Sequence, residues 1–177
     1  ETLRGGGPED FKQHCLEAAA QMLFASGTAA SLEGAEKMAA TTLQSGKALG
    51  FFRLLVEAQG GDARVIDNLE LLPKAPFTQT IKAKQNGWIA GVHARTFGET
   101  AILLGGGRAK KTDSIDHSVG MVVHVKVGDK IESGQPLVTI HAKSESDFAL
   151  AAERLQSAIT WSDREIEPLP LFYGVIE

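Results

Sequence analysis

Hydrophobic residues recur at helical spacing over the first part of the chain and then change to an alternating pattern. Over residues 8–60, apolar positions three or four residues apart predict three helices, broken near Gly27 and Gly46 and closed at Gly60. Ser31 is a suitable N-cap for the second of them. Their predicted inward positions are Phe11, Cys15, Leu16, Ala19, Met22 and Leu23, then Leu32, Ala35, Ala39 and Leu43, and then Ala48, Phe51, Phe52, Leu55 and Val56. These faces have little to pack on within the chain, so we expect them to cover part of a larger α/β body.

A segment of turn-forming residues separates this helical part from the rest. Residues 62–76 predict a linker, because aspartates and an asparagine favour turns and two prolines prevent a continued helix. We therefore place one domain at residues 1–70 and a second at 77–177. At the other end of the first domain, Glu1–Gly5 has the pattern of a last helical turn with a glycine stop. This start indicates missing sequence upstream, and either an engineered truncation or proteolysis would explain such a start equally well.

From Phe77 onward the pattern is typical of short strands and turns. Asn86-Gly87 predicts a two-residue turn that returns the strand beginning at Phe77. Ser144 with Asp147 resembles a capping box, which predicts a helix whose face includes Phe148, Ala151, Ala152, Leu155 and Ile159. The predicted strands cover 77–83, 88–92, 121–125, 137–140 and 171–176, with a further helix over about 94–104. The expected fold class is α+β: helices of a truncated α/β domain followed by a small antiparallel sheet domain with β-hammerhead, barrel-sandwich-like character.

Composition and charge exclude several classes of protein. The chain has 177 residues, 43% of them hydrophobic and 23% charged, which is the balance of a globular protein rather than a disordered one. The formal net charge of −4 and the scattered basic residues argue against a nucleic-acid partner. No apolar run approaches the roughly 20 residues needed to span a bilayer, so no membrane partner is expected. Cys15 is the only cysteine, which excludes an internal disulfide and fits a cytoplasmic location.

Several specific segments occur in the order typical of one enzyme family. These segments are Glu1–Gly5, Gly7–Asp10, Ser45–Ala48, Ala58–Asp62, Leu72–Ala75, Gly105–Lys111, Asp113, Ile115–Asp116, Ser118–Gly120, Val127–Lys130, Pro136–Leu137 and Thr139–Ala142. On these segments the chain resembles the carboxy-terminal part of thymidine and pyrimidine nucleoside phosphorylases, and the details favour the bacterial pyrimidine branch. That branch is expected to accept both uridine and thymidine, and a thymidine-specific enzyme is the alternative.

The resemblance implies a reaction and also implies which parts of the enzyme this chain lacks. Members of the family carry out reversible phosphorolysis, in which phosphate attacks the anomeric carbon and yields a pyrimidine base and a pentose 1-phosphate. Their phosphate cradle, their base-binding residues and the ligands of a monovalent cation correspond to sequence upstream of Glu1. We therefore assign no catalytic or metal residue and no cofactor to this chain, and we expect it to be inactive alone. The resemblance also implies a homodimer formed through the missing amino-terminal domain.

One glycine-rich basic segment is a candidate anion site. Gly105–Gly107 precedes Arg108, Lys110 and Lys111. A P-loop requires a strand before its glycines and a helix after them, whereas here a predicted helix comes first and a loop follows. The simplest interpretation is a helix C-cap and a solvated basic loop. An intermediate hypothesis is that the loop faces the cleft of the full enzyme and becomes ordered when the domains close.

Histidines and carboxylates provide weaker candidates. None of the five histidines pair at a metal-binding spacing. His124 and His141 are expected to be neighbours on paired strands, with a structural hydrogen-bonding role. Asp113 and Asp116 could be an acid–base pair, but in a polar loop such residues more often form turns.

A second class of protein shares the turn pattern of the carboxy-terminal half. Val127–Lys130 with Gly134–Leu137 and Ile140 also resembles biotinyl and lipoyl carrier domains, whose modified lysine stands on an exposed hairpin tip. Lys143 lies nearby, without the flanking methionine usual in carriers. The alternative function is therefore a non-catalytic binding or carrier module. The helices predicted over 8–60 argue against it, because a carrier domain has no use for them.

Overall fold

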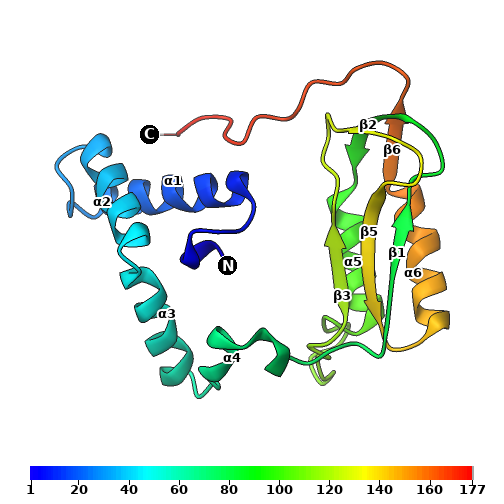
Figure 1. The fold of residues 1–177 in the computed structure, drawn as a ribbon, viewed down its shortest axis with the longest axis horizontal. Helices are drawn as coiled ribbons and strands as arrows, with labels where there is room; N and C mark the ends of the chain where they lie inside the picture. The colour runs from blue at the N-terminus through cyan, green and yellow to red at the C-terminus, as the bar shows by residue number, and fades with distance from the viewer. Residues whose placement is uncertain (177) are drawn as a thin grey trace. The chain divides into compact units, whose positions relative to one another are not determined.

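The computed structural model describes residues 1–176 and separates into two compact units (Figure 1). Unit 1 consists of Glu1–Leu71 and the tail that begins at Leu171, and unit 2 is Leu72–Pro170. Unit 1 is helical, whereas unit 2 combines antiparallel sheets with helices. The predicted α+β class is confirmed, and the hammerhead character stays a prediction.

The three helices predicted for unit 1 are present as α1 (Glu9–Ala25), α2 (Leu32–Gln44) and α3 (Lys47–Ala58). The Ser31 hydroxyl accepts a hydrogen bond from the Gly34 amide at 3.1 Å, which confirms the predicted N-cap. The expected linker is less irregular than predicted. It contains a short helix, α4 (Arg64–Asp67), and a 3₁₀ turn, η2 (Leu69–Leu71). Another 3₁₀ turn, η1 (Thr2–Arg4), lies outside the linker at the start of the chain.

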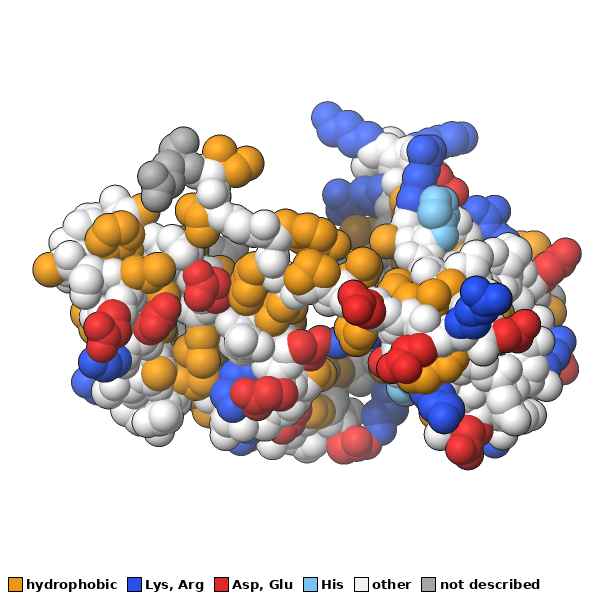
Figure 2. Space-filling view, turned by 90° about the horizontal axis from the view of Figure 1, so that it is seen from above, with side chains coloured by type: hydrophobic (Ala, Val, Ile, Leu, Met, Phe, Trp, Pro, Cys, Tyr) orange, Lys and Arg blue, Asp and Glu red, His pale blue; other side chains and the backbone are white. Residues whose placement is uncertain are grey.

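Unit 1 buries few large side chains. Its buried hydrophobic residues are four alanines and Ile66, whereas Met22 and Phe51 are each 70% exposed. Figure 2 shows hydrophobic side chains spread over the surface of this unit, on the left of the view. Exposed apolar surface of this extent is typical of a face that packs against another protein surface. The expectation that these helices leave their apolar faces uncovered is therefore confirmed for Phe52 and Leu55 as well, which are 42% and 55% exposed.

The strand predicted over residues 171–176 is wrong. Residues 171–176 are irregular, and the Phe172 ring stacks on His14, with centroids 5.6 Å apart and planes at 5°. A strand needs a neighbouring strand for its backbone groups, and the described residues of unit 1 form helices and turns. Alternating apolar residues alone therefore did not produce a strand here.

Unit 2 contains two three-stranded antiparallel sheets and two helices. The first sheet has the order β1-β5-β3 and the second the order β4-β2-β6. Helices α5 and α6 pack on each other, and α6 also packs on β1 and β5. The elements are β1 (Phe77–Lys82), β2 (Gly87–Val92), α5 (Ala94–Leu104), β3 (Gly120–Val123), β4 (Lys130–Ile131), β5 (Pro136–Ala142), α6 (Glu145–Ser157) and β6 (Ile159–Ser162).

The predicted hairpin between β1 and β2 is wrong, because the two strands belong to different sheets. The Asn86 side chain does not close a turn on β1, and its Oδ1 accepts a hydrogen bond from the Ser133 amide at 2.8 Å. The backbone of Ala83 exchanges two bonds of 2.8 Å with the same turn, through Gln135 and Gly134. The chain therefore crosses from one sheet to the other at residues 83–87.

The core of unit 2 joins both sheets and both helices. Ile89, Val138, Ile140 and Leu155 are fully buried, and they are the largest apolar side chains to be so. The helix start predicted at Ser144 is confirmed, since the Ser144 hydroxyl caps α6 by accepting from the Asp147 amide at 3.1 Å. The predicted helix face extended too far, however. α6 ends at Ser157, and Ile159 is the first residue of β6, a strand that the pattern did not predict.

Candidate functional site

The glycine-rich segment after α5 ends that helix. Gly105 adopts a left-handed conformation with φ of 99°, and the Gly106 amide donates to the carbonyl of Ala101 at 2.9 Å. A helix thus precedes the glycines and a turn follows them, so the segment lacks the strand–loop–helix order of a P-loop. The interpretation as a C-cap is confirmed.

Asp113 organises the basic part of the loop from within. Its Oδ2 accepts hydrogen bonds from the amides of Ala109 and Lys110 at 3.1 and 2.8 Å, and its carbonyl accepts from the Arg108 Nε at 3.1 Å. These local bonds are those of a turn-forming aspartate. Asp113 therefore acts as a turn former, and this agrees with the simpler of the two interpretations.

The three predicted cations lie on the outside of this turn. Arg108, Lys110 and Lys111 are all exposed. Within residues 1–176 the Lys110 and Lys111 ammonium groups have no acidic partner, and Arg108 bonds only to a carbonyl. The loop therefore presents three cations that form no ion pair within residues 1–176, on a backbone that Asp113 holds in place. No catalytic group converges with it in the part of the chain described.

A second aspartate connects the loop to the strand β5. The Asp116 Oδ1 accepts from the Ser118 amide at 2.9 Å and from its hydroxyl at 2.6 Å, and its Oδ2 lies 3.6 Å from the Lys143 Nζ. The Asp116 amide donates to the Gly105 carbonyl at 2.9 Å. Bonds from Ser118, and then the charge of Lys143, lower the pKa of Asp116. Lys143 is thus ion-paired between β5 and α6, away from any hairpin tip, which argues against a carrier lysine.

This arrangement predicts the pH response of Asp116. A carboxylate whose pKa is lower in the folded state stabilises that state above its unfolded pKa, and the stabilisation is lost as the pH falls through the folded pKa. We expect Ser118→Ala to raise the pKa of Asp116 clearly, and Lys143→Met to raise it less. Titration of the side-chain carboxyl carbon by NMR measures both shifts. An unchanged pKa in Ser118→Ala would show that the serine hydroxyl, as distinct from its backbone amide, does not hold the carboxylate.

His124 and His141 make structural hydrogen bonds with threonine hydroxyls. His124 Nε2 lies 2.8 Å from the Thr139 hydroxyl, which lies 2.8 Å from that of Thr80, and His141 Nδ1 lies 3.2 Å from the hydroxyl of Thr78. The expected bonding role is confirmed, but the two histidines are not neighbours. His141 is opposite Gly120, whereas the His124 amide bonds to Leu137. Among the described residues, no cluster of three or more histidine, cysteine or acidic side chains could hold a metal.

Within residues 1–176, no helix is both long and apolar enough to cross a bilayer.

Comparison with known proteins connects this domain to a family. Residues 88–162 match the family described as the pyrimidine nucleoside phosphorylase C-terminal domain. A pyrimidine-nucleoside phosphorylase of Staphylococcus aureus (strain MSSA476) is 36% identical over 177 residues, which are 100% of this chain and 41% of that protein. One from Geobacillus stearothermophilus is 41% identical over 145 residues, or 82% of this chain and 34% of that protein.

The chain thus spans about two fifths of the length of the relative that it matches from end to end. The region that matches the family includes the loop, its Asp116 anchor and every strand of unit 2 except β1, which precedes it. The chain belongs to the pyrimidine nucleoside phosphorylase family and corresponds to the carboxy-terminal part of its members.

Proposed function

We propose that the chain works as the carboxy-terminal part of an enzyme that catalyses reversible phosphorolysis of pyrimidine nucleosides. The observation that carries the proposal is the 36% identity to a pyrimidine-nucleoside phosphorylase along all 177 residues. Uridine and thymidine are the proposed substrates, with phosphate as co-substrate, and the enzyme is a pentosyltransferase. A thymidine-specific enzyme remains the alternative.

The proposal divides the labour between this chain and the rest of such an enzyme. The described residues contain no convergent set of reactive groups, so phosphate, base and the monovalent cation are assigned to the remainder. The homodimer contact is assigned there too, and the proposed setting is the cytoplasm. The chain itself supplies the helices of unit 1, with their exposed apolar faces, and the sheet domain of unit 2.

We assign the loop at Arg108, Lys110 and Lys111 to the attraction of phosphate toward the cleft. Its cations lack acidic partners within residues 1–176, and the Asp113 turn fixes their backbone. A cluster of like charges beside a cleft raises the local concentration of an oppositely charged substrate, and salt screens this effect. The loop is thereby given an electrostatic role and no part in bond making.

The proposed activity can be tested with the relative from Geobacillus stearothermophilus. The chain alone is expected to release no base from uridine or thymidine in phosphate. The relative shortened by its matched region is expected to be inactive as well, and a chimera with this chain in that place should regain phosphate-dependent release of base. A folded but inactive chimera, or turnover by the chain alone, would contradict the proposal.

The same chimera tests the loop. Changing Arg108, Lys110 and Lys111 to Gln should raise KM for phosphate about threefold or more at low salt, with little change in kcat, and the effect should shrink as salt increases. Three exposed cations elsewhere, changed to Gln, provide the control: Lys37, Lys47 and Arg95. If the two triple variants raised KM for phosphate equally, the proposed role of the loop would be contradicted.

A further inference from the structure

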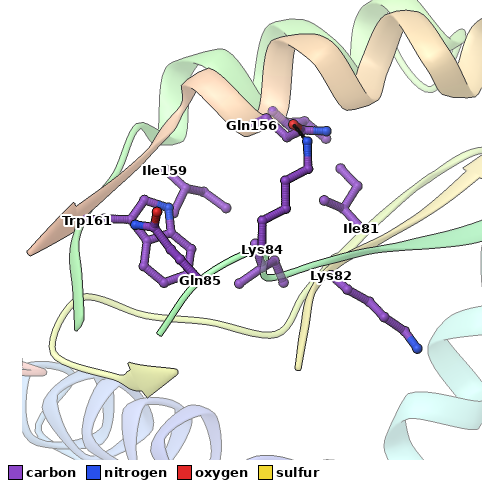
Figure 3. Close-up of a pocket in the computed structure, with 9 residues that line it drawn as sticks. Ile81, Lys82, Lys84, Gln85, Gln156, Ile159 and Trp161 are labelled. Atoms are coloured by element: carbon purple, nitrogen blue, oxygen red, sulfur yellow. Dashed lines mark hydrogen bonds between the residues drawn. The ribbon is translucent and has the colours of Figure 1, made fainter. Parts of the chain in front are cut away.

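Unit 2 has a groove of about 170 Å³ that the sequence did not reveal (Figure 3). It opens between the end of β1 and the helix α6 with the strand that follows it. Its floor consists of buried aliphatic side chains, and the half-buried Trp161 closes one end. The aliphatic residues, each less than 9% exposed, are Ile81, Leu137, Leu155 and Ile159. Leu155 has no exposed surface and the other three have little, so the apolar surface that a ligand would contact is mainly that of the half-buried Trp161.

The mouth of the groove is polar and carries positive charge. It is formed by Lys82, Lys84, Gln85 and Gln156, and no acidic residue is among the lining residues that the structure describes. The Lys84 Nζ donates a hydrogen bond to the Gln156 Oε1 at 3.3 Å, which is at the long end of the normal range. In Figure 3 the Lys84 stem extends toward Gln156, whereas Lys82 extends away from it. One ammonium group thus spans an apolar groove and has only a neutral partner.

The backbone that carries Lys84 is already fixed. Ala83 is bonded on both its amide and its carbonyl, to Gln135 and Gly134 at 2.8 Å, and the Asn86 side chain accepts from the Ser133 amide at 2.8 Å. A ligand would therefore need to move only the end of the Lys84 side chain. Preorganisation of this kind lowers the entropic cost of binding.

We propose that this groove binds a small organic anion, namely a carboxylate on a single aromatic ring. The ring would lie against the half-buried Trp161, and the carboxylate would accept the Lys84 hydrogen bond in place of Gln156. A bond from an ammonium to a carboxylate is stronger than one to a neutral amide. The size also fits, since an apolar protein cavity of about 150 Å³ takes up benzene. This inference concerns the groove alone and does not depend on the proposed phosphorolysis.

Benzoate titrated into the ¹⁵N-labelled chain, followed by amide NMR shifts, is the direct test. The expected dissociation constant is on the order of 1 mM, with shifts concentrated at residues 81–85 and 155–161. Benzyl alcohol keeps the ring but not the charge, and it should bind about tenfold more weakly. Lys84→Met keeps the stem and should weaken benzoate about tenfold, whereas Lys84→Arg should stay within about twofold.

Lys111→Met is the matched control, because it removes a lysine from the basic loop instead. It should leave benzoate binding unchanged, and the NMR spectra report whether each variant is folded. The proposal is overturned if Lys84→Met binds as well as the parent chain, if the shifts gather at the basic loop, or if no saturable shift appears up to about 20 mM.

Discussion

Gly128→Ala is expected to destabilise unit 2 by about 2–5 kcal/mol, from backbone strain and steric overlap together. Gly128 has φ of 96°, a left-handed conformation that costs an L residue about 1–2 kcal/mol. A Cβ at this position would lie 2.7 Å from both the Cα and the backbone nitrogen of Pro168. Because these are backbone atoms, no side-chain rotation can relieve the overlap. The Gly128 amide also donates to the Ile89 carbonyl at 2.9 Å, which ties the turn to the buried strand β2.

Gly134→Ala provides a matched control for this expectation. Gly134 has φ of 91° and an open surrounding, with no atom within 4 Å of an added Cβ. It should therefore show only the strain, about 1–2 kcal/mol. Urea unfolding measures both variants, and the two tryptophans, Trp88 and Trp161, both lie in unit 2, so their fluorescence follows that unit. Equal losses in the two variants would show that Pro168 does not pack on Gly128 in solution.

Elements that local signals mark were predictable from the sequence. The helix expected over 94–104 is α5, with the same bounds, because the apolar spacing and the glycine after it are local features. The caps at Ser31 and Ser144 were found for the same reason, since a cap depends on residues within one turn.

Pairing between strands could not be predicted in the same way. β1 pairs with β5, so that Thr80 is opposite Thr139. No local feature of the sequence near either residue indicates this pairing. The Asn86-Gly87 signal was misleading because its partner is a turn far along the chain at Ser133. β4 has two residues, too few to form an alternating pattern, and β6 follows α6 almost directly.

The same distinction between local contacts and contacts distant in sequence applies to the candidate site. The turn role of Asp113 was predictable, because its partners lie within five residues. The contact of Asp116 with Lys143 and the bond of Lys84 to Gln156 join residues distant in sequence, and only the fold brings them together. The exposed faces of unit 1 were anticipated because a helix with an apolar stripe requires a surface to pack on.

Leu155→Ala is expected to lower the free energy of unfolding of unit 2 by about 2–5 kcal/mol, the usual cost of a cavity at a buried leucine. Leu155 is 0% exposed, and it lies on α6 in the cluster that joins both sheets. Leu150→Ala, on the same helix, changes a side chain that is 49% exposed and should cost no more than about 0.5 kcal/mol. Both substitutions make the same chemical change in one helix, so helix propensity cancels and the difference measures burial. Urea unfolding followed by tryptophan fluorescence measures it. Equal costs would mean that α6 does not pack through Leu155, and the floor of the Lys84 groove would then be wrong as well, because Leu155 forms part of it.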